Sequence, residues 1–375
     1  MVYIFILVLA LCLLISVVAY GNRYPRKQVK WIFAFLIIAL AGIGACVEPK
    51  YIYDLFRHYE VLDSVRYSSY SLGSFLEEGY QITDFNYRYT YVYNIFVYIV
   101  AKFLPNQAFP FITIVVTYSL FSYIIFREFG DEALTNRNII LSFAIFSVLM
   151  PYLFVYSNIR NALAGAVVAY GIYRLYKDRK VAIFVMCTVS AVLIHPVAAA
   201  IVPFIILSRI KPGVKGIIVT LAVPSLMFPV MEYFRLVFEN DFLFAIASKY
   251  YNYTLVRVDD QGRIFLYSTI IILIILSVLA LWSQRRKKME RKEKSYALLN
   301  LIIWYSMFSL GYFSNYEMIT RLPYTIAFLS PVVVNTLFNH TEMNTSVAQI
   351  ACIGSAGVIF VLALFGVYAN IAWML

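Results

Sequence analysis

The chain has 375 residues, of which 62% are hydrophobic and 14% are charged, and its formal net charge is +11. Soluble domains average about 45–50% apolar and about 25% charged residues, so this chain cannot cover its surface with polar groups. The composition excludes a soluble enzyme and a disordered chain, and it predicts an all-α integral membrane protein. The four cysteines form no CxxC pair and no zinc-binding spacing, so neither a disulfide framework nor a metal site is predicted.

Apolar stretches of spanning length run along most of the chain. A membrane-spanning helix needs about 20 predominantly apolar residues. The clear candidates are 2–20, 31–47, 138–156, 264–283, 296–313, 322–338 and 347–370. Shorter or interrupted candidates are 89–104, 109–126, 161–173, 181–208 and 216–231. Basic residues follow the first stretch and none precedes it, which predicts a retained helix with its N-terminus outside and not a cleaved signal peptide.

Four short segments carry the basic residues that orient the chain: 21–30, 174–180, 209–215 and 284–294. Together they hold 18 of the 31 Lys and Arg residues but only 3 of the 20 Asp and Glu residues. An excess of Lys and Arg in short loops marks the cytoplasmic side. Most of the positive charge therefore reflects topology and gives no nucleic-acid signal, and attraction to anionic lipid is a smaller contribution.

Two longer hydrophilic segments are then predicted to face outward. Segment 48–88 holds four basic residues, seven acidic residues and seven tyrosines, and segment 235–263 holds four charges of each sign. Both exceed the length at which structureless loops become uncommon, about 12–15 residues. This favours external loops that are partly folded and functional.

The orientation also constrains how many stretches cross the membrane. Segments 21–30 and 174–180 are both predicted to be cytoplasmic, yet five apolar stretches lie between them. One of these must not cross, and 89–104 is short and rich in tyrosine, a residue that favours the membrane interface. We therefore interpret 1–375 as a single membrane domain with about 12 crossings (11–14), in which 48–104 is an external loop with interfacial or re-entrant helices and 235–263 is a second external loop.

Arg160 is the first candidate site residue. It opens a predicted helix 14 residues before Arg174 of a basic segment, a distance of roughly 21 Å along a helix. Because the hydrocarbon core is about 30 Å thick, Arg160 is predicted to lie below the outer surface. A buried arginine is costly and is expected to face a partner or a water-filled cavity. The alternative is an arginine whose side chain extends outward to the headgroups.

His195 is the second candidate. It lies 15 residues after Lys180, roughly 22 Å up the next helix, and Pro196 interrupts the run 181–208. This run is long for one crossing and short for two, which predicts a hairpin with its apex below the outer surface. Arg160 and His195 would then reach the same depth on neighbouring antiparallel helices. A structural histidine in an apolar run is the alternative.

Further charged residues lie near predicted helix ends. Arg321 is predicted to open the helix 322–338, and Glu317 lies four residues before it, so an i,i+4 pair is possible; a structural ion pair is the alternative. The outer end of 31–47 is followed by a cluster of Asp54, Arg57 and His58, of which Asp54 and His58 share one helix face. Arg257 and Arg263 in the second external loop are weaker candidates, with solvated charges as the alternative.

Together these residues predict a polar, cationic cavity that opens to the outside. Arginine binds phosphate through a two-pronged contact, aromatic faces suit the apolar side of sugar rings, and a histidine with a carboxylate can perform acid–base chemistry. A lipid-linked saccharide combines a membrane location, phosphate and hydroxyls. No Walker or GxGxxG loop is present, so no nucleotide cofactor is predicted.

Three elements resemble the EpsG-type branch of the bacterial Wzy polysaccharide polymerases. They are Asn158-Ile159-Arg160-Asn161-Ala162-Leu163-Ala164, the basic turn Tyr176-Lys177-Asp178-Arg179-Lys180, and Ile194-His195-Pro196-Val197-Ala198. The early acidic residue with a nearby tyrosine (Asp54, Tyr59) and the late Ile319-Thr320-Arg321-Leu322-Pro323-Tyr324 are also similar. The chain departs from the family pattern where Asn161 replaces glutamine and Thr320 replaces glutamate.

The resemblance implies a GT-C-like architecture and a metal-independent polymerase that makes O-antigen, capsule or exopolysaccharide. Such an enzyme joins repeat units carried on undecaprenyl diphosphate at the outer face of the cytoplasmic membrane and releases undecaprenyl diphosphate. It implies that Arg160 and Arg321 bind the diphosphate, and that His195 acts as base or orients the acceptor hydroxyl. Asp54 and His58 are the reserve base and sugar contacts. Weaker sugar contacts are Arg57, Tyr59, Asn161, Glu317, Tyr324, Arg257 and Arg263.

The expected partners are the undecaprenyl-diphosphate-linked oligosaccharide and membrane lipid, together with a flippase and a chain-length regulator, and no nucleic acid. Two other classes stay open. A lipid-linked oligosaccharide flippase or transporter predicts internal repeats and polar groups near the bilayer midplane. A membrane acyltransferase predicts a His–Arg pair in the first span, which 2–20 does not contain.

Overall fold

The computed structural model describes residues 26–46, 49, 54–78, 89–129, 146, 152–237, 270, 274, 277–278, 280–282, 294–313 and 315–339. Within these residues every regular element is a helix and no strand occurs, which confirms the predicted all-α fold class. The chain forms two compact units. The first comprises Met1–Phe143, Met150–Ile172 and Val181–Ala199, and the second comprises Ala144–Leu149, Tyr173–Lys180 and Ala200–Leu375.

Three helices in the described part of the chain are long and apolar enough to cross a membrane: Lys27–Cys46, Ala108–Glu128 and Val214–Phe234. Five shorter apolar helices in the same described part are Tyr91–Phe103, Val181–Ile194, Pro196–Leu207, Ser295–Leu310 and Tyr324–Thr336. Large apolar side chains such as Trp31, Phe35 and Met186 are exposed on these helices, as expected for faces that meet lipid. The predicted stretches 2–20 and 347–370 lie outside the described residues, so the number of crossings stays a prediction.

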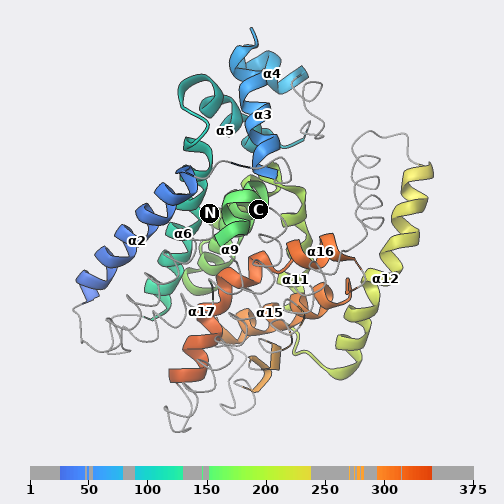
Figure 1. The fold of residues 1–375 in the computed structure, drawn as a ribbon. Helices are drawn as coiled ribbons and strands as arrows, with labels where there is room; N and C mark the ends of the chain where they lie inside the picture. The colour runs from blue at the N-terminus through green and yellow to red at the C-terminus, as the bar shows by residue number, and fades with distance from the viewer. Residues whose placement is uncertain are drawn as a thin grey trace, which may run out of the picture. The chain divides into compact units, whose positions relative to one another are not determined.

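Two long helices, α2 (Arg26–Cys46) and α6 (Ala108–Glu128), run side by side in the first unit (Figure 1). The ring of Phe33 near the start of α2 meets the ring of Phe126 near the end of α6, with their centroids 5.3 Å apart. The two helices are therefore antiparallel. On the predicted topology this places the end of α2 and the start of α6 on the same, outer side.

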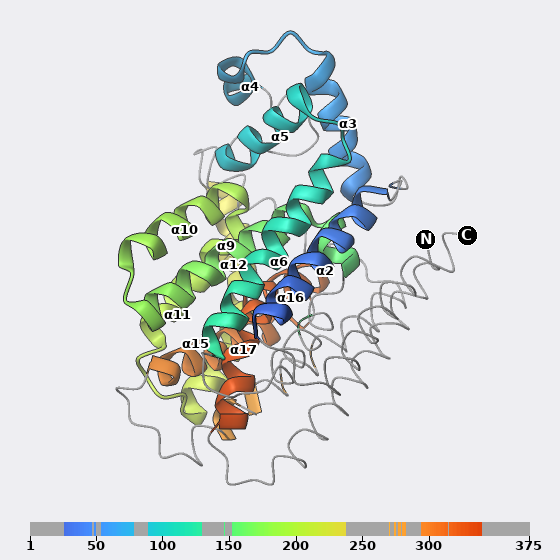
Figure 2. The same ribbon diagram turned by 90° about the vertical axis from the view of Figure 1, so that its left-hand side faces the viewer.

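A group of three helices, called here the cap, lies beyond these ends: α3 (Asp54–Tyr67), α4 (Leu72–Glu78) and α5 (Tyr91–Phe103) (Figure 2). At 13 residues α5 is about 20 Å long, less than the hydrocarbon core of about 30 Å. Whether 89–104 crosses the membrane stays a prediction. The ring of Phe75 on α4 lies against Tyr98 of α5, with the centroids 5.9 Å apart, so α4 packs on the C-terminal half of α5.

The helices α3 and α5 are parallel, because the same sequence offset of 35 residues joins them at two levels. His58 meets Tyr93 near their N-terminal ends, and Arg66 meets Ala101 near their C-terminal ends. The C-terminal ends are tied by side chains that bind the last carbonyl groups of the opposite helix. Such groups have no partner within their own helix. The two N-terminal ends therefore also lie together.

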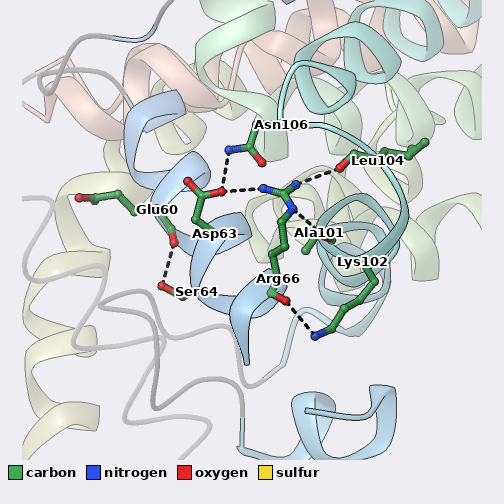
Figure 3. A network of polar contacts seen from close by, with 8 residues as sticks. All are labelled: Glu60, Asp63, Ser64, Arg66, Ala101, Lys102, Leu104 and Asn106. Carbon is green, nitrogen blue, oxygen red and sulfur yellow. Dashed lines mark hydrogen bonds and ion pairs between the residues drawn. The ribbon is translucent and has the colours of Figure 1, made fainter. Parts of the chain in front are cut away.

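Figure 3 shows the network at the C-terminal ends. The guanidinium of Arg66 donates to the carbonyl oxygens of Ala101 (3.0 Å) and Leu104 (2.9 Å) and to Oδ1 of Asp63 (2.6 Å). In return, Nζ of Lys102 donates to the carbonyl oxygen of Arg66 at 3.5 Å (Figure 3) and to that of Ser68, which the figure does not draw, at 2.8 Å. Each helix thus receives a cation at its C-terminal end, where the helix dipole is negative.

The first unit continues through α8 (Tyr152–Ser157), α9 (Ile159–Asp178) as far as Ile172, and α10 (Val181–Ile194). The helices α9 and α10 approach closely at Gly171, where an added Cβ atom would lie 2.7 Å from Cβ of Cys187. This contact explains a glycine in a helix interior, where it otherwise costs about 1 kcal/mol relative to alanine. After α10 the helix stops at His195, and the 3-10 helix η2 (Pro196–Ile201) follows.

The second unit is built around α15 (Lys294–Leu310), which packs against α11 (Val202–Leu207), α12 (Val214–Val237), α16 (Tyr316–Arg321) and α17 (Tyr324–Asn339). Polar side chains bind the carbonyl groups of the turn after α11. Nδ2 of Asn300 donates to Ser208 at 2.8 Å, and Nε1 of Trp304 donates to Ile210 at 3.0 Å. The hydroxyl of Ser208 lies 2.5 Å from that of Tyr176. The helix in the run 181–208 breaks at His195–Pro196, as the sequence predicted.

Candidate functional site

The N-terminal ends of three helices meet in the first unit, and each contributes one buried polar or charged side chain. His58 is the fifth residue of α3, Tyr93 the third of α5 and Arg160 the second of α9. The exposed fractions of these residues are 3%, 1% and 7%. An arginine is almost never this buried without a structural or functional reason. The three residues are called here the His58–Tyr93–Arg160 cluster.

Tyr93 stands between the other two members of the cluster. Its hydroxyl oxygen lies 2.9 Å from Nδ1 of His58, a hydrogen bond in which the tautomer of the histidine decides the donor. The Cζ atom of Arg160 lies over the ring of Tyr93, 5.5 Å from its centroid, which is a cation–π contact. The ring of Phe109 closes the group, with its centroid 5.7 Å from that of His58.

The electrostatics of the cluster keep the histidine neutral. The pKa of His58 is held well below its ordinary value of 6.5, chiefly by burial and then by the positive charges of Arg160 and Arg57. Burial disfavours the charged form of a histidine, and like charges add to this effect. The imidazole is therefore uncharged at neutral pH and can either donate or accept a proton at a second ring nitrogen.

The helix ends add to the positive potential at the cluster. The first amide groups of a helix have no carbonyl partner within that helix, and the aligned peptide dipoles give its N-terminus a partial positive charge. In α9 the first hydrogen bond of the helix is donated by the amide of Ala162 to the carbonyl of Asn158 at 3.0 Å. The amides of Ile159, Arg160 and Asn161 come before this first bond. A guanidinium beside such an end is suited to an anion.

His195 and Arg160 lie on the same side of the contact between α9 and α10. The two helices touch where Gly171 faces Phe184 and Cys187. Arg160 lies eleven residues before Gly171, about 16 Å along its helix, and His195 lies eight residues after Cys187 and eleven after Phe184, about 12–16 Å along the chain from the same contact. The predicted match in depth stays a prediction.

The hydrogen bonding of His195 defines its tautomer. The backbone N–H of Val197 donates to Nδ1 of His195 at 3.2 Å. A ring nitrogen that accepts a hydrogen bond carries no proton, so the neutral ring has its proton on Nε2. In this state the buried His195 is a hydrogen-bond donor through Nε2 and not a base.

The remaining candidates of the first unit lie around the cluster. Asp54 is the first residue of α3, where a carboxylate favours the helix dipole, and it shares a helix face with His58, one turn away. Arg57 is exposed on α3. Burial raises the pKa of Tyr59 to about 12. Neither the hydroxyl of Tyr59 nor Oδ1 of Asn161, both buried, has a hydrogen-bond partner among the residues that the structure describes.

Arg321, Glu317 and Tyr324 belong to the second unit. The prediction that Arg321 opens the helix 322–338 is wrong, because Arg321 is the last residue of α16 and α17 begins at Tyr324. Pro323 lies in the turn between the two helices, as expected for a residue that cannot donate within a helix. Glu317 keeps the predicted four-residue spacing to Arg321 within α16, and Tyr324 is buried. The candidates Arg257 and Arg263 lie outside the described residues.

Tyr93 was missed from sequence. It lies in a stretch with several tyrosines, which we interpreted as interfacial residues. The sequence contained a signal, because the buried residues of α5 recur at helical spacing: Tyr93, Asn94, Val97, Val100 and Ala101. That spacing separates Tyr93 from the exposed Tyr91 but does not identify His58 as its partner.

Among the described residues, no group of three or more His, Cys, Asp or Glu side chains could hold a metal ion. The predicted metal independence of the chain stays a prediction. The chemistry that the cluster offers is instead that of a cation, three helix N-termini, a phenol and a neutral imidazole.

The fold and the cluster together describe a helical protein with helices long and apolar enough to cross a membrane and a buried arginine beside helix N-termini in its first unit. A family model described as the EpsG family matches residues 50–374, and the chain belongs to that family. Comparison with curated proteins and comparison with solved structures gave no match. Membership of the EpsG family indicates a glycosyltransferase-like polymerase in polysaccharide biosynthesis, and the apolar helices fit a membrane protein.

Proposed function

We propose that the chain polymerises oligosaccharide repeat units carried on undecaprenyl diphosphate, at the outer face of the bacterial cytoplasmic membrane. Family membership supports the reaction class. The single observation that carries the proposal is the His58–Tyr93–Arg160 cluster, which brings a buried guanidinium, a neutral imidazole and helix N-termini together. A glycosyl diphosphate needs this combination, because the transfer separates a diphosphate anion from a sugar while a hydroxyl loses its proton.

The reaction joins two lipid-linked chains. A hydroxyl oxygen of one repeat unit attacks the anomeric carbon of the reducing-end sugar of the growing chain. The bond from this carbon to the diphosphate oxygen breaks, and the electron pair leaves with undecaprenyl diphosphate. The proton of the hydroxyl passes to a base. No nucleotide sugar is needed, since the energy of the glycosyl diphosphate drives the transfer.

Arg160 binds the diphosphate in this proposal and stabilises the charge that develops on it. Preorganised positive groups are usually the largest contribution to catalysis of this kind, and removing one donor typically costs about 100- to 1,000-fold in rate. The first amides of α9 lie beside Arg160 and add hydrogen-bond donors. The buried amide oxygen of Asn161, which has no partner among the described residues, is placed to accept a hydrogen bond from a sugar hydroxyl.

The two buried histidines differ in what they offer. His195 donates through Nε2, because its Nδ1 accepts from Val197, so we assign it to orienting the acceptor or a phosphate oxygen. His58 can present Nε2 without a proton when its Nδ1–H donates to Tyr93, so we assign it as the general base. A general base typically contributes about 100- to 10,000-fold in rate. Asp54, one turn before His58, is the reserve base.

Arg321 is proposed as a second diphosphate ligand, with Glu317 and Tyr324 as weaker sugar contacts. These roles come from the resemblance of 319–324 to the late motif of the family. A double variant at Arg160 and Arg321 tests whether both arginines act on the same diphosphate. If both arginines bind one diphosphate, the double variant loses far less activity than the product of the two single losses.

The experiment compares surface polysaccharide from a bacterial host that lacks the chain and carries the wild type or a variant. We expect a single-unit product in the null strain and a ladder of lengths with the wild type. Arg160→Ala should abolish the ladder while the protein stays in the membrane, and Arg160→Lys, which keeps the charge but not the two-pronged contact, should restore part of it. A normal ladder from Arg160→Ala contradicts the proposal.

The matched control is Lys180→Ala, which removes an exposed cation from the turn after the same helix and should leave the ladder unchanged. His58→Gln should shorten the ladder more than Asp54→Asn does, since Asp54 is the reserve. If the null strain accumulates lipid-linked units on the cytoplasmic side, the chain is a flippase and the polymerase proposal fails.

A further inference from the structure

We propose that the His58–Tyr93–Arg160 cluster is a base that its substrate switches on. A diphosphate bound at Arg160 allows His58 to take up a proton, and Tyr93 is the positioning residue that fixes the two side chains for this coupling. The inference rests on the proposed function for the identity of the anion, and it concerns how that same site is regulated.

The geometry places one rigid ring between the two charged groups. The Cζ atom of Arg160 lies 5.5 Å from the centroid of the Tyr93 ring, and the centroid of the His58 ring lies 5.8 Å from it. The sum of these two distances is the upper limit of the separation between the Arg160 Cζ atom and the centroid of the His58 ring, about 11 Å. Tyr93 is 1% exposed, and the rings of Phe109 and His58 pack against it, so its ring is held in place.

The titratable groups around His58 come from its own helix and from the helices packed near it. On α3 they are Asp54 and Arg57, on α5 Tyr93 and on α9 Arg160. The α6 neighbour, Phe109, carries no charge. The helix α8 packs on α3, and its titratable residues are Tyr152 and Tyr156.

The charges that act on His58 are the two guanidinium groups, and both disfavour its protonation. Arg57 is exposed to solvent and is screened there, whereas Arg160 is buried. At about 11 Å and an effective dielectric constant of about 20, one buried positive charge changes the proton affinity of an imidazole about ten-fold, which is one unit of pKa. A diphosphate carries more than one negative charge, so its arrival removes this effect or reverses it.

The coupling orders the steps of the reaction. Without substrate, the charge of Arg160 lowers the proton affinity of His58. One ring nitrogen then has a free lone pair, but it binds a proton only weakly. When the diphosphate is bound, Nε2 of His58 can accept the proton of the acceptor hydroxyl as its oxygen bonds to the anomeric carbon. The carbon–oxygen bond to the diphosphate breaks, and the diphosphate takes the electron pair while it is held at Arg160. Once undecaprenyl diphosphate leaves, the charge of Arg160 returns the proton of His58 to water.

The test uses the small number of histidines, because the chain contains three. Protein with isotope-labelled histidine is purified into nanodiscs, and the His58 resonance is assigned with His58→Gln. Its pKa is then measured by NMR alone, with inorganic pyrophosphate and with farnesyl diphosphate. We expect a pKa below 6.5 alone and a rise of at least about one unit with either probe. A larger rise with farnesyl diphosphate shows that the lipid-linked form is the ligand.

Variants separate the charge from the hydrogen bond. Arg160→Gln should raise the pKa of His58 by about one unit without any probe and should remove the response to pyrophosphate, whereas Arg160→Lys should keep the response. Tyr93→Phe keeps the ring under Arg160 but removes its hydroxyl, so the nitrogen chemical shifts of His58 should report a changed tautomer. Tyr98→Phe is the matched control, since its hydroxyl binds the carbonyl of Tyr70 on the same cap, and it should change neither quantity.

The inference is overturned if the pKa of His58 is the same with and without both probes, or if Arg160→Gln leaves it unchanged in protein that elutes as the wild type does. These outcomes are separate from the fate of the proposed function. An unmoved His58 in a chain that makes a polymer ladder refutes the coupling alone. A moved His58 in a chain whose removal leaves the ladder normal refutes the polymerase and leaves the anion-coupled histidine standing.

Discussion

Arg66→Met tests whether the network at the C-terminal ends of α3 and α5 holds the cap together. The substitution keeps an apolar stem of similar length and removes every bond of the guanidinium (Figure 3). The two bonds that are lost to Ala101 and Leu104 are partly buried or exposed, so each is worth about 1 kcal/mol. The ion pair with Asp63 adds little, because the two side chains are 26% and 47% exposed and exposed pairs contribute about 0–1 kcal/mol.

The expected loss is therefore about 2 kcal/mol, confined to the cap. Local opening then becomes about thirty-fold more frequent, since 1.4 kcal/mol is a factor of ten. Hydrogen exchange followed by mass spectrometry measures this directly in peptides from the C-terminal halves of α3 and α5. Glu77→Gln, which removes an exposed charge from α4 of the same cap, should leave exchange unchanged. Unaltered exchange in Arg66→Met would show that the parallel pairing of α3 and α5 does not depend on this network.

Two further predictions concern packing and pH. Gly171→Ala places a Cβ atom 2.7 Å from Cβ of Cys187, so it should lower the free energy of unfolding by about 1–3 kcal/mol. The control is Gly42→Ala, whose added Cβ meets nothing within 4 Å. An equal thermal stability of both variants would disprove the close approach of α9 and α10. Because the folded state holds the pKa of His58 below the 6.5 of the unfolded chain, the unfolded state binds more protons below pH 6.5. Stability should therefore fall by about 1.4 kcal/mol for each pH unit from 6.5 down to the lowered pKa. His58→Gln should lose this part of the pH dependence in thermal unfolding, and an identical dependence in both proteins would contradict it.

The local order of the central segment could be predicted from the sequence. The helix that Arg160 opens, the basic turn, the next helix and its interruption at His195–Pro196 all appear as α9, residues 179–180, α10 and the break before η2. These features depend on interactions within a few residues. Helix periodicity, a charged turn and a proline that cannot donate within a helix are each visible without knowledge of the fold.

The pairing that forms the candidate site could not be predicted in this way. His58 and Tyr93 are 35 residues apart, and they meet because α3 and α5 pack in parallel with ends joined by Arg66 and Lys102. The local sequence around each residue contains no pattern that predicts contact with the other. Arg160 and His58 were therefore predicted as separate candidates, and the packing of three helix ends brings them together.

The prediction for Arg321 failed for a local reason. The apolar run from 322 to 338 suggested one helix that begins at Arg321, but Pro323 separates α16 from α17. The side chain of Asn315 starts α16 by accepting from the amide of Met318 at 3.1 Å, a helix cap that the sequence around it also allows. A proline so close to the start of an apolar run was the signal for a boundary at that position.

The most direct test of the proposed activity is polymerisation by the purified chain. The wild type and Arg160→Ala are placed in nanodiscs with the lipid-linked repeat unit extracted from the null strain. We expect the wild type to form a ladder and to release one undecaprenyl diphosphate for each link, without added nucleotide sugar and in the presence of a metal chelator, while Arg160→Ala forms no ladder. A wild-type chain that leaves the length of the substrate unchanged would contradict the proposed function.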